Sequence, residues 1–152
     1  MVIDYENWKI EDWQSPVVDI EDLQMVSLSD DNRSLTIIVQ GLLDPERRRF
    51  RISFSEYPAY RNINEDYRNE LWNALSKNVG KWGRTFVVLN SSWLQSFSRE
   101  TLSFIYPQIS HYVICTEDDV IEVLSPEPPE IVEIEPASEN EELPGKSEIY
   151  WK

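Results

Sequence analysis

The sequence predicts an α+β domain with an antiparallel or mixed β-sheet of about six strands, two to three helices packed on one face, and an acidic, proline-rich C-terminal tail. Alternating, β-branched segments dominate the stretch before residue 56, and the apolar period becomes helical after residue 64. Proline and glutamate then replace the apolar runs after Leu124. With 152 residues, 41% of them hydrophobic, the chain suits one packed domain.

The first half of the domain is predicted to be an antiparallel meander with one face on a core. Its three strands are expected at residues 23–29, 35–40 and 49–55. Turns are expected at Ser29–Asn32, where Asp and Asn side chains bond their own backbone, and at Asp44–Arg47, where a proline presets φ.

The second half mixes helices and strands. Residues 65–78 carry apolar side chains at helical spacing, and Asn64 is the expected N-cap. A buried strand is expected at residues 85–89. Ser91 or Ser92 then begins a helical stretch, as one helix or two short ones, which Pro107 ends. The expected elements close with a hairpin of residues 111–117 and 120–124.

The chain divides by composition into an acidic arm (1–20), the α+β domain (21–125) and an acidic tail (126–152). The net charge of −14 comes from the two ends, because residues 32–125 contain equal numbers of acidic and basic side chains. This distribution repels nucleic acid and anionic membranes and favours a basic protein partner. Solubility alone is an equally good explanation of the charge.

Several observations predict a cytoplasmic protein. No run approaches the ~20 apolar residues of a membrane span, and the first residues lack the basic and apolar regions of a secretory signal. The single cysteine, Cys115, cannot form an internal disulfide, which suits a reducing compartment. The oligomeric state is left open.

Sequence motifs for catalysis or cofactor binding are absent, so no enzyme, cofactor or metal site is predicted. Four glycines assemble no phosphate loop. On one strand, His111 and Cys115 lie ~13 Å apart, too far for a thiol–imidazole pair, and a satisfied strand-edge histidine beside an inert buried thiol is expected instead. The acidic group Glu117–Glu122 lacks the spacing of a calcium loop and is expected to be a solvated turn.

Six tryptophans exceed what one small core needs. Trp72 and Trp93 are expected in the core, while Trp8 and Trp13 are expected to dock the N-terminal arm on the domain. Trp82 and Trp151 are candidates for a protein interface, with core packing as the alternative for each. The full set of predicted partner-binding residues is Trp82, Asp118, Asp119, Glu122, Ile149, Tyr150 and Trp151.

The segment Ser92-Trp93-Leu94 and the run from His111 to Leu124 resemble small bacterial immunity-type proteins of polymorphic or contact-dependent toxin systems. In that family a late hairpin carries a similar His-Tyr … Ile-Glu-Val-Leu run. The resemblance implies a small, non-catalytic, cytoplasmic protein that covers the active site of a basic toxin with carboxylates. Acids in residues 4–31 or near Glu117–Glu122, with exposed tryptophans, would form that surface.

Two other functions compete with this interpretation. An adaptor or assembly factor would dock through the tail 127–152, with Ile149, Tyr150 and Trp151 as its linear motif. An enzyme that uses carboxylates alone is the third hypothesis.

Overall fold

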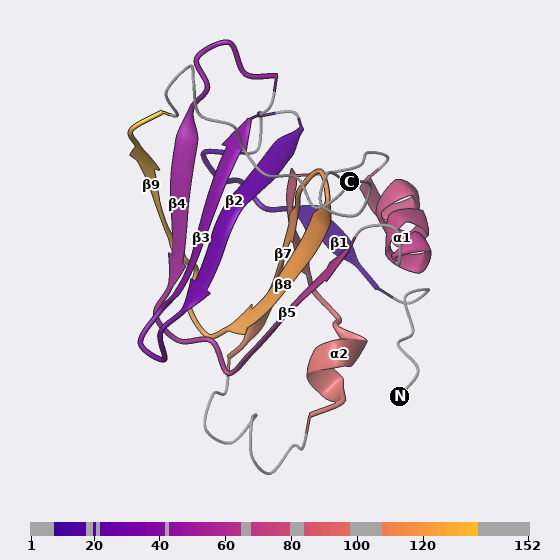
Figure 1. Ribbon diagram of the computed structural model, residues 1–152. Coiled ribbons are helices and arrows are strands. Elements are labelled where there is room, and N and C mark those ends of the chain that lie inside the picture. The colour runs from indigo at the N-terminus through magenta and orange to yellow at the C-terminus, as the bar shows by residue number, and fades with distance from the viewer. Residues whose placement is uncertain are drawn as a thin grey trace, which may run out of the picture.

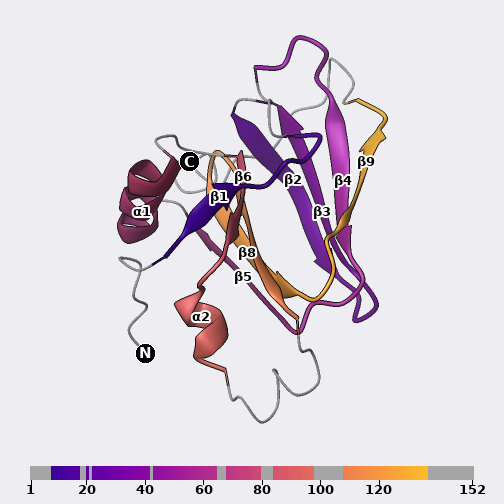
Figure 2. The ribbon, with the colours of Figure 1, turned by 180° about the vertical axis from the view of Figure 1, so that it is seen from behind.

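The computed structural model describes residues 8–17, 20, 22–41, 43–64, 68–79, 84–97 and 108–136. In these residues the chain is mostly antiparallel β-sheet, with nine strands in two sheets and two helices. Figures 1 and 2 show the two sheets and the helices as successive layers. The α+β expectation therefore holds at the level of fold class, but the described strands form two sheets rather than the single sheet of about six strands that the sequence predicts.

The four-stranded sheet has the order β2-β3-β4-β9 and every pairing in it is antiparallel. Its strands are β2 (Leu23–Asp30), β3 (Leu35–Gly41), β4 (Arg49–Phe54) and β9 (Glu130–Ile134). The first three are the predicted meander. Alternate side chains of β3 and β4, such as Ile37 and Ile52, are fully buried between the sheets. A β-bulge shifts the register of β2 between Met25 and Ser27.

The five-stranded sheet has the order β1-β6-β7-β8-β5 and is also antiparallel throughout. Its strands are β1 (Ile10–Asp12), β6 (Arg84–Val88), β7 (Ser110–Cys115), β8 (Asp119–Ser125) and β5 (Ala59–Asn64). Every residue of β8 is buried, because one face of this sheet packs on the four-stranded sheet and the other lies under the helices.

Two helices, α1 (Asn69–Val79) and α2 (Ser92–Gln95), supply apolar side chains to the core on the far side of the five-stranded sheet. Trp72 of α1 and Trp93 of α2 are buried there, as expected, and Trp8 packs in the same cluster. The Trp13 ring contacts Tyr112 edge-on and packs against the core between the two sheets. No helix in the described ranges is both long and apolar enough to span a bilayer.

The predicted turns form by the predicted chemistry. Asp31 Oδ1 accepts hydrogen bonds from the backbone N–H groups of Arg33 and Ser34, both at 2.8 Å. In the next turn, the N–H of Arg47 donates to the carbonyl of Asp44 at 3.0 Å, across the proline. Asn32 and Arg47 take positive φ values of 69° and 52° to complete these turns.

Three strands depart from the expected plan. The expected N-cap, Asn64, is instead the last residue of β5, a strand that the sequence did not predict. β1 lies in the segment assigned to the arm, and β9 lies in the segment assigned to the tail. Both add to the edge of a sheet by backbone pairing, which composition does not reveal. Beyond α2, the predicted helical residues 98–107 lie outside the described residues.

We expect truncation after Ser125 to destabilise the domain more than truncation after Pro136. The shorter chain lacks β9, so it loses the pairing with β4 and the contact of Ile131 with the core between the sheets. The loss is on the order of 2 kcal/mol in the free energy of unfolding. Urea titration of both variants measures it, and equal midpoints would contradict the assignment of β9 to the domain.

Candidate functional site

A buried carboxylate lies on the helix-covered face of the five-stranded sheet, on the strand next to its edge. Glu122, on β8, is fully buried. Its Oε1 accepts from His111 Nε2 at 2.9 Å and from Arg61 Nη2 at 3.1 Å. Its Oε2 accepts from Arg61 Nε at 2.6 Å and lies 2.8 Å from Arg68 Nη1. Four nitrogens, from β5, β7 and the residue before α1, therefore converge on one carboxylate of β8.

The pKa of the Glu122 carboxyl is well below its usual range. Burial alone would raise it, but the hydrogen bonds from His111 and Arg61, with the nearby positive charge, outweigh burial. At neutral pH the carboxylate is ionised and can only accept hydrogen bonds. His111 Nε2 must therefore carry the proton that faces Glu122.

The other ring nitrogen of His111 extends this contact into a chain of hydrogen bonds that runs from Ser91 through His111 to Glu122. Its Nδ1 lies 2.7 Å from Ser91 Oγ, and the ring is fully buried. Burial lowers the pKa of His111 more than Glu122 raises it, so the ring is neutral and Nδ1 accepts from the Ser91 hydroxyl. Ser91 Oγ in turn accepts from the N–H of Leu94 at 3.0 Å and is the N-cap of α2.

Serine, imidazole and carboxylate thus align as in a nucleophilic triad. Ser91 is only 3% exposed and His111 and Glu122 are fully buried. In this conformation the hydrogen bonds from Ser91 through His111 to Glu122 join α2 to the sheet, and the Ser91 hydroxyl is not open to a substrate.

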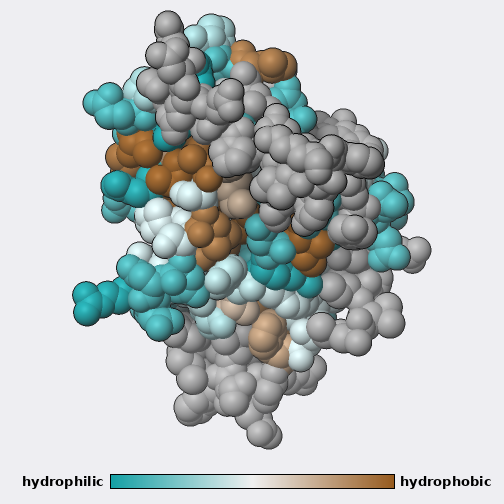
Figure 3. All heavy atoms as spheres, viewed as in Figure 1, coloured by the Kyte–Doolittle hydropathy of each residue, from teal (hydrophilic) through white to brown (hydrophobic). Residues whose placement is uncertain are grey.

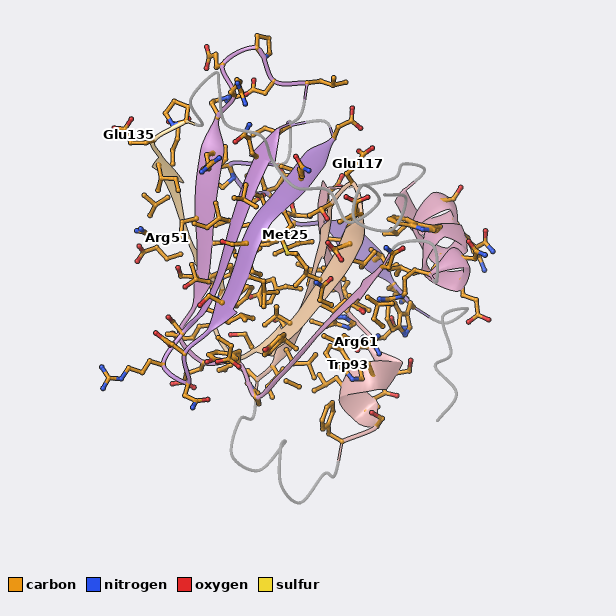
Figure 4. All side chains as sticks on the ribbon, in the orientation of Figure 1. Met25, Arg51, Arg61, Trp93, Glu117 and Glu135 are labelled. Atoms are coloured by element: carbon orange, nitrogen blue, oxygen red, sulfur yellow. The ribbon has the colours of Figure 1, made fainter. Side chains whose placement is uncertain are left out.

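Aromatic rings enclose the histidine. Trp8 and Trp93 contact the His111 ring edge-on, with centroids 5.2 and 5.1 Å away. The Trp8 indole N–H also donates to Ser92 Oγ at 2.8 Å. Arg61 lies over Trp93, with 4.2 Å from its Cζ to the ring centroid. In Figure 4 Arg61 and Trp93 lie side by side, where the edge of the sheet meets α2.

The charged part of the surface lies elsewhere. Figure 1 shows the β2–β3 turn and the β4–β5 and β8–β9 connections at the lower end of the two sheets. We call the acidic residues of these connections and their flanking strand ends the acidic end. All of its side chains are exposed: Asp30, Asp31, Glu56, Glu127 and Glu130.

Contacts hold the parts of the acidic end together. Ser125 Oγ lies 2.6 Å from the carbonyl oxygen of Glu56 and 2.7 Å from that of Glu127. The Tyr57 hydroxyl donates to Asp30. This bond lowers the pKa of Asp30 and raises that of Tyr57 to about 12. Asp30 is therefore ionised and fixed in place at neutral pH.

The structure describes three of the predicted partner-binding residues, and these three do not form one exposed surface. Asp118, in the β7–β8 turn, is half-buried, while Asp119 is buried. Glu122 is interior, so it does not present its carboxylate to a partner as expected, because alternation on β8 directs it beneath the helices. The group Glu117–Glu122 is thus only partly a solvated turn. Trp82, Ile149, Tyr150 and Trp151 lie outside the described residues.

Sequence reasoning missed the partners of the single histidine. Cys115 is a buried free thiol, as expected. His111 lies on the central strand β7 rather than at a strand edge. Its two hydrogen-bond partners come from the N-cap of α2 and from β8, and Arg61, which pairs with Glu122, lies on the unpredicted strand β5. The only available signal was a set of isolated charges, Arg61 and Glu122, inside otherwise strand-like runs.

No protein-family model matches the chain, and neither the curated proteins nor the solved structures give a significant match. Within the described ranges, no three histidine, cysteine or acidic side chains gather as metal ligands would. Fold and local chemistry are therefore the basis for a functional proposal.

Proposed function

We propose that this chain is a non-catalytic protein-binding module whose acidic end docks a basic partner. The observation that carries the proposal is the convergence of Asp30, Asp31, Glu56, Glu127 and Glu130, from three connections, on one end of the sandwich. Asp30 and Asp31 accept hydrogen bonds from Tyr57 and from the backbone, so these two carboxylates are held in place and lose little side-chain entropy when a basic surface binds.

Tyr57 and Tyr60 add aromatic contact area to the carboxylates of the acidic end. Their rings lie 6.1 Å apart, and both are half-buried beside the carboxylates. Tyrosine supplies contact area with a polar tip, and it is common where protein interfaces are energetically important. A partner that presents lysine or arginine among apolar side chains would match this combination.

The immunity-type interpretation is the more specific form of the proposal. A basic toxin nuclease binds phosphates, so a cluster of carboxylates can occupy its active site in their place. The acids Asp30 and Asp31 fall in the segment 4–31 that this interpretation selects. The cognate partner would then be a basic, phosphate-binding protein, and the site of action would be the cytoplasm.

Affinity capture from the native host tests the proposal. The full chain and a chain ended after Pro136 serve as baits, because this truncation retains β9. We expect both baits to capture the same basic protein, and the affinity to fall several-fold as salt rises from about 50 to about 300 mM, because salt screens surface charges. A partner captured only by the full chain would favour an adaptor that binds through its tail.

A further inference from the structure

The guanidinium of Arg61 uses only one of its two hydrogen-bonding edges inside the fold. Nε and Nη2 donate side-on to the two oxygens of Glu122, at 2.6 and 3.1 Å. A guanidinium has five N–H donors, so two N–H groups on Nη1 and one on Nη2 remain. Within the described part of the chain, no hydrogen bond engages Nη1 of Arg61.

This second edge is held in a fixed position. Glu122 forms an ion pair with one edge of the guanidinium, and Cζ of Arg61 lies 4.2 Å from the centroid of the Trp93 ring. Glu122 is fully buried and Trp93 is 6% exposed, so both supports are themselves rigid. The Arg61 side chain nevertheless keeps 19% of its surface accessible. An arginine held in this way loses little conformational entropy when it binds a ligand.

The electrostatics leave Arg61 attractive to an anion. The Glu122 carboxylate is shared between Arg61 and Arg68, so it does not cancel the charge of either fully. His111 is neutral because burial lowers its pKa, and it adds no charge of its own. The rest of the protein is strongly acidic, with a net charge of −14, which limits the affinity for a free anion.

We propose that Arg61, stacked on Trp93 and anchored by Glu122, is a binding site for an oxyanion, a carboxylate or phosphate group held end-on by Nη1 and Nη2. Planar, bidentate recognition of this kind is the particular property of arginine, and lysine does not reproduce it. This site is separate from the acidic end. It binds a negatively charged group, whereas the acidic end binds a positively charged surface.

The test follows the Nε–H signal of Arg61 by two-dimensional ¹⁵N NMR while sodium phosphate or sodium acetate replaces sodium chloride at constant ionic strength. We expect a saturable shift in the millimolar range, and the anion that saturates first identifies the preferred group. Arg51 is the internal control, because it is exposed on β4. Its signal should move little and without saturation.

Arg61→Lys is the matched variant, since it keeps the positive charge but lacks the planar pair of N–H donors that binds an oxyanion bidentately. We expect its Trp93 indole signal to respond to the same anion about 10-fold more weakly than in wild type. An Arg51→Lys variant should respond as wild type does. A wild-type Arg61 signal that never saturates, or that moves in parallel with Arg51, would overturn the proposal even if Arg61→Lys failed to fold.

Discussion

Glu122→Ala should lower the free energy of unfolding by about 3–5 kcal/mol, the usual cost of breaking a buried ion pair by removing one partner. The substitution removes the carboxylate from Arg61, Arg68 and the Nε2–H of His111. His111 and Arg68 lie in the interior and Arg61 is only 19% accessible, so water replaces the lost bonds only in part. The effect is large because one side chain satisfies three partners.

Urea unfolding at pH 7 measures this loss, and Glu127→Ala is its control. Glu127 is an acid of the same sequence region whose side chain is exposed, so its removal should change stability by no more than about 0.5 kcal/mol. The loss of stability in Glu122→Gln should lie between those of the other two variants. The amide keeps the shape of the carboxylate, but its NH₂ group faces N–H donors of the surrounding side chains. A Glu122→Ala protein within about 1 kcal/mol of wild type would show that the charge cluster does not stabilise the fold.

Acid should destabilise the protein in two separate steps, and the first belongs to His111. Burial lowers the folded-state pKa of His111 below its ordinary 6.5. Below pH 6.5 the unfolded chain therefore takes up a proton that the folded chain does not, so stability falls as the pH falls toward the folded pKa. The expected loss between pH 6.5 and 5.5 is at most about 1 kcal/mol, the value for a folded ring that takes up no proton in this range.

The second step occurs at lower pH and belongs to carboxylates. Hydrogen bonds lower the pKa of Asp30, Asp31 and Asp44, and the same is true of Glu122. The stability they contribute is complete above their unfolded pKa values near 4 and is lost as the pH falls below them.

Urea unfolding at a series of pH values separates the two steps. His111 is the only histidine of the chain, so His111→Gln should abolish the loss between pH 6.5 and 5.5 whatever its effect at pH 7. A variant that retains the same slope there would refute the assignment to His111.

The fold was predictable where local patterns decide the structure. The alternation in β4 and the β-branched run of β3 placed two central strands within a residue or two. β5 was missed because Tyr60, Arg61 and Asn62 show no apolar alternation, and all six residues of that strand are only half-buried. Its position depends on pairing with β8, a tertiary effect that a single sequence does not show.

The buried site was not predictable for a related reason. Ser91 looked like an N-cap, which it is, but its hydroxyl also donates to a histidine 20 residues away. Glu122 looked like a surface acid because a buried carboxylate is rare unless it is paired. Its partner Arg61 is 61 residues away in sequence, and only strand register brings them together. The acidic end was predictable as charge but not as one surface.

The most direct test of the account measures the affinity of the captured partner for a variant with a neutralised acidic end. In Glu56→Gln/Glu127→Gln/Glu130→Gln three exposed acids lose their charge, and the control Glu11→Gln/Glu70→Gln/Glu135→Gln makes the same change in net charge at exposed sites elsewhere. We predict that the first variant binds at least about 10-fold more weakly, a loss of about 1.4 kcal/mol, while the control stays within about threefold of wild type. Equal weakening of both variants, or no weakening of either, would contradict the claim that the acidic end is the binding surface.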